Sequence, residues 1–323
     1  MATETIKKLW KNEYFQTLLT VALLLLTVLG GYYAAQIALG TSYPALAVAS
    51  GSMLPTLNIG DLIIVQKIDP TQIKADSNGL TGDILVYRRG DELIVHRAVK
   101  IEKVNGVYYI TTRGDNSGVN DPPWPSTNLV GKVVMRIPFI GNFPLLLHSE
   151  RNMYIFFLAI LVIIIILMLP SSTTQEKKPG ENMASEGKVP KIRLDHILYI
   201  ALNALIIGLT IFSIWGSYTF PQPGAKPPMA TIRGMLADKQ YHESFPNVYN
   251  TSLSQGFLTY RIDCQLSAGT RLGVPTFAWY QFFIFVLIVF NAWKTYNFYK
   301  EWKAEEKAQK TAETEISTST EYA

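Results

Sequence analysis

Hydrophobic residues in this chain gather in four long runs that carry almost no charge. The first, residues 18–39, is long enough as a helix to cross the roughly 30 Å hydrocarbon core of a bilayer. Because it exceeds the apolar region of a cleavable signal peptide, we interpret it as a retained anchor. Similar runs cover 153–169, 197–216 and 277–293, the last with aromatic residues at both ends. The pattern predicts a membrane protein with four transmembrane helices.

Basic residues near these runs predict the side of the membrane that each segment occupies. Lysines and arginines are placed before the first run, between the second and third, and after the fourth. Since such residues stay in the cytoplasm, we expect a cytoplasmic N-terminus (1–17), linker (170–196) and partly disordered tail (294–323). Residues 40–152 and a smaller region, 217–276, are then extracytoplasmic.

The segment 40–152 consists of short β-branched runs separated by turn signals. Gly-Asp pairs begin at Gly60, Gly82 and Gly90, and each precedes such a run. Asn105-Gly106 separates two further runs, which is the signature of a two-residue hairpin. We therefore expect a mainly-β domain anchored by the transmembrane helices.

The Asn-Gly turn also predicts which residues face each other. A type I′ turn followed by an unbulged ladder pairs residues whose numbers sum to 211, which places His96 opposite Asp115. Side chains alternate between the faces of a strand, so His96 shares a partly apolar face with Ile94 and Ala98. His96 is the histidine that lies inside a predicted strand of this domain.

Charge and composition exclude several kinds of function. The formal net charge is +4 and the basic residues lie at the membrane borders, so a nucleic-acid partner is not expected. The single cysteine, Cys264, rules out an intramolecular disulfide framework and a cysteine metal cluster. His96, Asp115 and Asp121 lack a third nitrogen or sulfur ligand nearby, and no nucleotide-binding loop occurs. We expect neither a metal nor a cofactor.

The stretch ASGSMLPTLNIGDLIIV, residues 49–65, places Ser52 at the entrance of a predicted strand. A serine there, a histidine on a buried strand face and a carboxylate form a set of nucleophile, base and orienting acid. Serine needs such help because its hydroxyl is a weak nucleophile, whereas imidazole can accept its proton near neutral pH. The simpler alternative is a turn serine and a structural histidine.

Four sequence blocks in order, SGSMLPT, GDILVYR, IVHRAV and RGDNSGVND, resemble the type I signal peptidases of archaea and the endoplasmic reticulum. The resemblance covers residues 18 to about 147. It implies that Ser52 is the nucleophile and that His96 takes the place of the lysine base found in the bacterial branch. It also implies that Ser50 donates to the oxyanion together with the Ser52 amide.

Two carboxylates compete for the third catalytic position. The resemblance places the triad acid at Asp121 and gives Asp115 a supporting role, whereas the hairpin register favours Asp115. Because bulges are common near active sites, we give Asp121 more weight and retain both. Pro122 and Pro123 follow Asp121, where other members usually continue with acidic or small residues.

The implied activity is that of a membrane-bound serine endopeptidase that removes N-terminal signal peptides. Its partners are then secretory preproteins, the lipid bilayer and a translocon or accessory subunits. We expect the substrate to add a strand to a sheet edge, with Ala47 and Val48 as the floor of its pockets. The expected location is the cell membrane, as a multi-pass protein, with the endoplasmic reticulum membrane as the alternative.

Two other functions remain open from the sequence. A self-cleaving repressor-like serine protease also has a Ser-Met pair before Gly-Asp, but uses a lysine base and is soluble. A membrane-anchored binding or assembly protein would use the SGSM stretch only as a turn. The role of residues 171–323 is not explained, although Asn203, Gln281 and Asn291 are suited to hydrogen bonding between helices.

Overall fold

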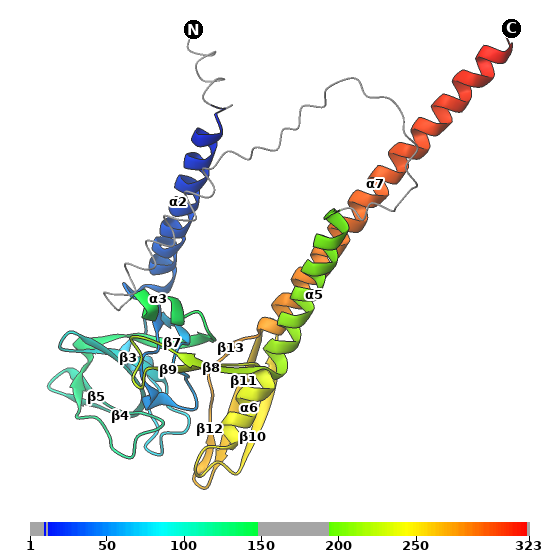
Figure 1. The fold of residues 1–323 in the computed structure, drawn as a ribbon. Coiled ribbons are helices and arrows are strands. Elements are labelled where there is room, and N and C mark those ends of the chain that lie inside the picture. Colours follow the sequence, from blue (N-terminus) through cyan, green and yellow to red (C-terminus); the bar gives the residue numbers. More distant parts are fainter. Residues whose placement is uncertain (1–9, 11, 148–193, 322–323) are drawn as a thin grey trace, which may run out of the picture. The chain divides into compact units, whose positions relative to one another are not determined.

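The computed structural model describes residues 10, 12–147 and 194–321. It divides into two compact units, each built from segments that are distant in the sequence. The first contains Met1–Gly187 and Gly216–Phe277, and the second contains Lys188–Trp215 and Ala278–Ala323. The first unit therefore combines residues from both halves of the chain (Figure 1).

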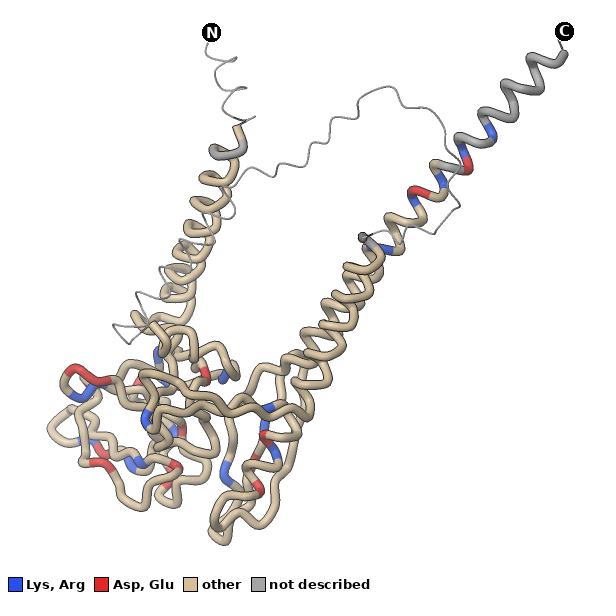
Figure 2. The backbone as a smooth tube through the Cα atoms, viewed as in Figure 1, with Lys and Arg blue, Asp and Glu red and all other residues tan. Residues whose placement is uncertain are grey.

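Three long helices match three of the predicted spans: α2 (Glu13–Leu39), α5 (Leu194–Trp215) and α7 (Trp279–Glu321). In the described residues, three segments are long and apolar enough to cross a membrane, namely Phe15–Leu39, His196–Trp215 and Trp279–Ala304. Figure 2 shows that charged positions are absent from most of α2 and gather in the later part of α7. The expected span at 153–169 lies outside the described residues.

The first unit is built on one mixed sheet, whose main path runs β10-β11-β13-β7-β3-β4-β5-β6. Strands β1 and β2 pair with each other, β2 also pairs with β7, and β12 pairs with β11. The strands are β1 (Ala45–Ala47), β2 (Leu62–Gln66), β3 (Ile84–Arg89), β4 (Glu92–Val104), β5 (Val107–Arg113), β6 (Trp124–Pro125), β7 (Leu129–Ile137), β10 (Asn250–Gly256), β11 (Thr259–Leu266), β12 (Gly269–Arg271) and β13 (Thr276–Phe277).

The later segment of the chain, residues 217–277, continues this sheet. Strand β13 pairs in parallel with β7 through Thr276 and Arg136, and β11 and β10 follow beyond it. A separate two-stranded sheet, β8 (Ser217–Pro221) with β9 (Met229–Arg233), leads into α6 (Met235–Glu243). The short helix α3 (Asn142–Leu147) follows β7. Residues on both sides of the undescribed interval 148–193 thus share one sheet.

The predicted hairpin at Asn105-Gly106 is confirmed, but its register is wrong beyond a bulge. Both turn residues have positive φ, 49° and 87°, as a type I′ turn requires. Pairs sum to 211 as far as Lys100 with Thr111, and then Ala98 pairs with Thr112, so Val99 is an extra residue. The bulge moves the partners by one position, and His96 does not face Asp115.

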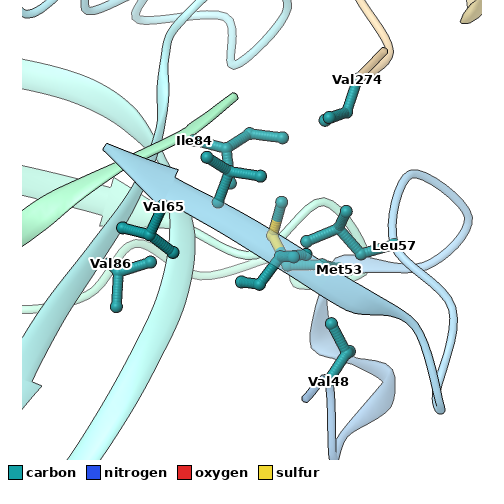
Figure 3. Close-up of a cluster of buried hydrophobic side chains, with 9 residues drawn as sticks. Val48, Met53, Leu57, Val65, Ile84, Val86 and Val274 are labelled. Carbon is teal, nitrogen blue, oxygen red and sulfur yellow. The ribbon is translucent and has the colours of Figure 1, made fainter. Parts of the chain in front are cut away.

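Hydrophobic side chains pack on both faces of β3, which explains why its first four residues are all buried. Ile84 and Val86 belong to one cluster, and Leu85 and Tyr87 to another. The first cluster also holds Val48, Met53, Leu57, Ile63, Val65, Val133 and Val274 (Figure 3). Because Val274 comes from the later segment, that segment contributes to the core beside Ser52.

A buried group of charges also joins the two segments. The Arg136 guanidinium on β7 is 2% exposed, forms an ion pair with Asp238 of α6 and lies 3.5 Å from Asp61. Asn58 Nδ2 donates to the second oxygen of Asp238, at 2.9 Å. Burial raises the pKa of Asp61 to about 7 although Arg136 opposes the shift, whereas Arg136 keeps the pKa of Asp238 below its ordinary value despite burial.

Polar side chains link the two helices of the second unit. Asn291 Nδ2 on α7 donates to Asn203 Oδ1 on α5 at 2.7 Å, and the Tyr199 hydroxyl donates to Asn291 Oδ1. The predicted hydrogen bonding between helices is confirmed for this pair. In an apolar environment such bonds favour a defined pairing of helices.

Candidate active site

Ser52 lies in the middle of a short 3-10 turn, Gly51–Met53, which follows the extended residue Ser50. The next side chain, Met53, is 1% exposed and packs in the core shown in Figure 3. Asn116 bonds the turn from the other side: its amide donates to Ser52 O at 2.9 Å, and its Nδ2 donates to Gly51 O at 3.1 Å. The apolar residue after Ser52 and a polar loop opposite it therefore hold the serine in place.

A cavity of about 340 Å³ lies beside this turn. Ser50, Ser52 and His96 all line it, and Ser50 Oγ lies 3.4 Å from Ser52 Oγ. Ala47 and Val48 line it as well, although the Val48 side chain also packs in the core. The remaining lining residues are Ala49, Met53, Leu57, Arg89, Glu92, Leu93, Ile94 and Val95.

His96 is held on the central strand β4 and is oriented by Asp121. Its Nδ1 atom lies 2.6 Å from Asp121 Oδ2, and the His96 side chain is 13% exposed. The Thr112 hydroxyl donates to the same oxygen at 2.6 Å, and Trp124 Nε1 donates to Thr112 Oγ1 at 3.1 Å. Burial alone would raise the pKa of the Asp121 carboxyl, but the bonds from His96 and Thr112 outweigh it and the pKa lies below its ordinary value. The Asp121 carboxylate therefore takes Nδ1 as its partner, and Nε2 is the ring nitrogen that Asp121 does not bind.

Asp115 binds a different partner, the Arg97 guanidinium. Arg97 Nε donates to Asp115 Oδ1 at 2.8 Å, and Nη2 donates to Oδ2, also at 2.8 Å. The Thr56 hydroxyl, just beyond the Ser52 turn, donates to Oδ2 at 2.5 Å. Burial would raise the pKa of Asp115, but the guanidinium beside it holds the pKa below its ordinary value. The structure thus separates the two carboxylates that the sequence left in competition.

Gly114 brings the two neighbourhoods together. A Cβ atom at this position would lie 2.6 Å from Ser52 O and 3.1 Å from His96 Nε2. The loop backbone at Gly114 therefore lies so close to both the serine turn and the imidazole ring that a side chain would force one of them to shift. Neighbouring Asp115 and Asn116 then reach Arg97 and Ser52 respectively.

Several residues that shape the site were not identified from the sequence. Thr112 and Arg97 are the most important, because each holds one of the two carboxylates. A signal was available for Arg97: it follows His96, so strand alternation sends it to the opposite face, where a buried arginine needs a carboxylate partner. Thr112 carried no comparable signal, because threonine is an ordinary strand residue.

The other histidines in the described residues, His196 and His242, do not line this cavity. His242 is buried on α6, with Nδ1 2.7 Å from the carbonyl oxygen of Asp238, and burial lowers its pKa. His196 lies on α5, and His148 falls outside the described residues. Within residues 10, 12–147 and 194–321, no three His, Cys, Asp or Glu side chains are grouped as a metal ion would require.

Such an arrangement can activate a hydroxyl. A carboxylate that accepts from Nδ1–H fixes the histidine tautomer and leaves Nε2 able to accept a proton. The Ser52 hydroxyl and the ring share one cavity, and a second hydroxyl, that of Ser50, lies beside the first. Catalytic hydrogen bonds are often long before substrate binds and tighten in the complex.

Comparison with known proteins confirms the resemblance to type I signal peptidases of the endoplasmic reticulum type. Signal peptidase complex catalytic subunit sec11 of Dictyostelium discoideum is 29% identical over 162 residues, covering 46% of this chain and 86% of that protein. The human subunit SEC11C is 27% identical over 166 residues, covering 48% and 83%. SEC11 of Clavispora lusitaniae is 28% identical over 154 residues, covering 44% and 87%. No protein-family model matches the chain.

Proposed function

We infer that this chain is a membrane-anchored signal peptidase that removes N-terminal signal peptides from secretory precursors, with Ser52 as its nucleophile. The observation that carries the catalytic assignment is the short contact between His96 Nδ1 and Asp121 Oδ2, on a ring that lines the same cavity as Ser52. The relatives named as catalytic subunits of a signal peptidase complex support the reaction.

The reaction begins with attack of Ser52 Oγ on the scissile carbonyl. The Oγ–C bond forms while His96 Nε2 takes the hydroxyl proton, and Asp121 stabilises the resulting imidazolium. The carbonyl electron pair moves to oxygen, where Ser50 Oγ–H and the Ser52 amide donate to the oxyanion. The C–N bond then breaks and His96 returns the proton to the leaving amine. Water, activated by the same imidazole, hydrolyses the acyl-enzyme and releases Ser52.

The cavity suits an extended peptide with small side chains. Its lining includes residues 47–50, just before the nucleophile, and residues 92–96 of β4, the last of which is the base. Strand β1 pairs with β2 along one edge, so an added peptide strand would use the other edge. Ala47 presents a small side chain to this cavity, which favours small substrate residues close to the cleaved bond. Replacing Ala47 by Leu should therefore change cleavage preference, and an unchanged preference would contradict this assignment.

Strand pairing supports the four-span topology of this proposal. Residues 40–147 and 217–277 share strand pairing, so both must lie on the same side of the membrane. If α5 crosses the membrane, a second crossing must occur between residue 147 and α5. We assign this crossing to the apolar run 153–169. With α2, α5 and α7 this gives four spans and both termini on one side, which the basic residues beside the apolar runs assign to the cytoplasm.

The same proposal covers partners and location. We assign secretory preproteins as substrates, the bilayer as the anchor, and a translocon or accessory subunits as further partners, because the relatives are named as subunits of a complex. The chain would reside in a cell membrane as a multi-pass protein, or in the endoplasmic reticulum membrane.

Cleavage of a model secretory precursor by purified full-length protein in lipid vesicles tests the function. The wild type should cut the precursor at its signal peptide junction, and Ser52→Ala and His96→Ala should lose all but a residual activity. Ser117→Ala and His196→Ala are matched controls, since neither residue lines the cavity, and both should cleave normally. A Ser52→Ala protein as active as the wild type would refute the proposal.

A further inference from the structure

The second half of the chain reaches the loop that supports Ser52. Arg271, the last residue of β12, donates from Nη1 to the carbonyl oxygen of Asp115 at 3.3 Å, across 156 positions of sequence. In return, Arg97 Nη2 donates to the carbonyl oxygen of Leu272 at 3.1 Å. The Leu272 amide bonds to Leu80 O at 3.0 Å. These three bonds tie residues 271 and 272 to the framework around Asp115.

Strand pairing fixes where these residues lie. Arg271 pairs with Cys264 of β11, β11 pairs with β13, and β13 pairs with β7 in the middle of the sheet. The Cys264 side chain is buried. Arg271 therefore extends from a strand that is hydrogen-bonded through to the central sheet and is not carried on a free loop.

The Asp115 loop transmits this placement to the nucleophile. Asp115 lies between Gly114, which passes close to Ser52 O and His96 Nε2, and Asn116, whose amide donates to Ser52 O. A shift of the Asp115 backbone must therefore move the serine turn, the imidazole or both. Near-attack geometry is sensitive to such shifts, and a displacement of about 1 Å can reduce the rate by about 10²-fold.

We propose that Arg271 is a positioning residue for the catalytic serine, so that the later segment of the chain, 217–277, completes the active site. Arg271 touches no reacting atom and acts through Asp115 and its loop. The inference rests on the proposed function, and it adds that the first half of the chain does not suffice for full activity. The relatives match under half of this chain.

Electrostatics agree with the geometry. The Asp115 carboxylate accepts from the Arg97 guanidinium, and the Arg271 guanidinium bonds the backbone carbonyl of the same residue. Burial alone would raise the pKa of the Asp115 carboxyl, but the charge of Arg97, with a smaller contribution from Arg271, holds the pKa below its ordinary value. Removing Arg271 leaves the Arg97 pair in place, so the fold should survive while the loop loses one of its supports.

The test is cleavage of a model precursor by full-length Arg271→Met protein in lipid vesicles, with kcat and KM measured separately. Methionine keeps the apolar stem and removes the donors. We expect kcat to fall about 10- to 100-fold with KM nearly unchanged, and Arg271→Lys to recover part of the loss because its ammonium can still donate to Asp115 O. Arg261→Met is the matched control: it lies on neighbouring β11, bonds Asp263 and is 42% exposed, and it should keep wild-type kcat.

A folded Arg271→Met protein with wild-type kcat would overturn the positioning role. A loss of activity that disappears when kcat is expressed per folded protein, measured by thermal unfolding, would also overturn it. So would a loss of kcat that Arg271→Lys does not relieve. If Arg271→Met does not fold, Arg271→Gln, whose shorter side chain cannot reach Asp115 O, takes its place with the same criteria. The Ser52→Ala protein separates the two proposals, because its full activity would refute the peptidase itself, whereas an inactive Ser52→Ala with a fully active Arg271→Met refutes only the role of Arg271.

Discussion

His96 Nδ1 lies 2.6 Å from Asp121 Oδ2, which joins the middle of strand β4 to the loop after β5. The loop is held there by its own backbone, since the Asp121 amide donates to Thr112 O at 2.7 Å. Asp115, six positions earlier, is turned to Arg97 instead. The two carboxylates therefore have different tasks: one orients the ring, and the other anchors the loop that supports Ser52.

Replacing Asp121 by Asn should impair chemistry more than folding. The amide can still approach Nδ1 but favours the wrong tautomer, so we expect kcat for precursor cleavage to fall roughly 10²- to 10⁴-fold. Timed precursor-cleavage assays with the full-length protein would measure this kcat. Asp91→Asn, at an exposed turn, is the control and should have no effect. Wild-type kcat for Asp121→Asn would show that another group orients His96.

Replacing Gly114 by Ala should also impair the reaction, through sterics alone. The new Cβ would lie 2.6 Å from Ser52 O and 3.1 Å from His96 Nε2, so the turn or the ring must shift. We expect kcat to fall by about 10²-fold. Gly118→Ala, four residues later in open space, should cleave normally. Equal activity of the two variants would mean that the loop yields without moving the catalytic groups.

Replacing Arg136 by Leu should destabilise the first unit strongly. Asp238 and Asp61 would remain buried without their cation, which typically costs about 3–5 kcal/mol. Thermal or urea unfolding of the full chain in detergent would measure the change. Lys100→Met on β4 is the control, because it breaks an ion pair with Glu102 in which both side chains are more than half exposed, and it should cost about 1 kcal/mol or less. A mild effect of Arg136→Leu would show that the later segment is held mainly by strand pairing.

The raised pKa of Asp61, about 7, predicts a pH dependence of stability. The folded protein keeps a proton on this carboxyl that the unfolded chain releases above about pH 4, so the contribution of Asp61 to stability is present at low pH and is lost as the pH rises to about 7. His242, whose pKa is lowered, acts in the opposite direction. The difference between wild type and Asp61→Asn isolates Asp61.

Unfolding midpoints measured from about pH 5 to about pH 7.5 would test this. Relative to Asp61→Asn, the wild type should become progressively less stable as the pH increases. A constant difference across this range would contradict the raised pKa.

Local sequence signals determined the elements whose formation depends on near neighbours. Uncharged runs specify α2, α5 and the first part of α7, because a continuous apolar surface of this length has few other stable environments. Asn105-Gly106 specified the hairpin, because these residues adopt positive φ at low cost. Ser52 and His96 were singled out as candidates by residue type and by the resemblance that their flanking blocks carry.

Tertiary structure alone decided how these parts meet. One extra residue, Val99, shifts the strand pairing, so that Asp115 does not pair with His96. Such a bulge depends on packing, which the turn sequence does not encode. The addition of β10, β11 and β13 to the sheet, and the contact of Arg271 with Asp115, join residues more than a hundred positions apart. Such contacts depend on which buried surfaces and charges complement one another in three dimensions. The periodicity of hydrophobic residues along the chain does not determine this.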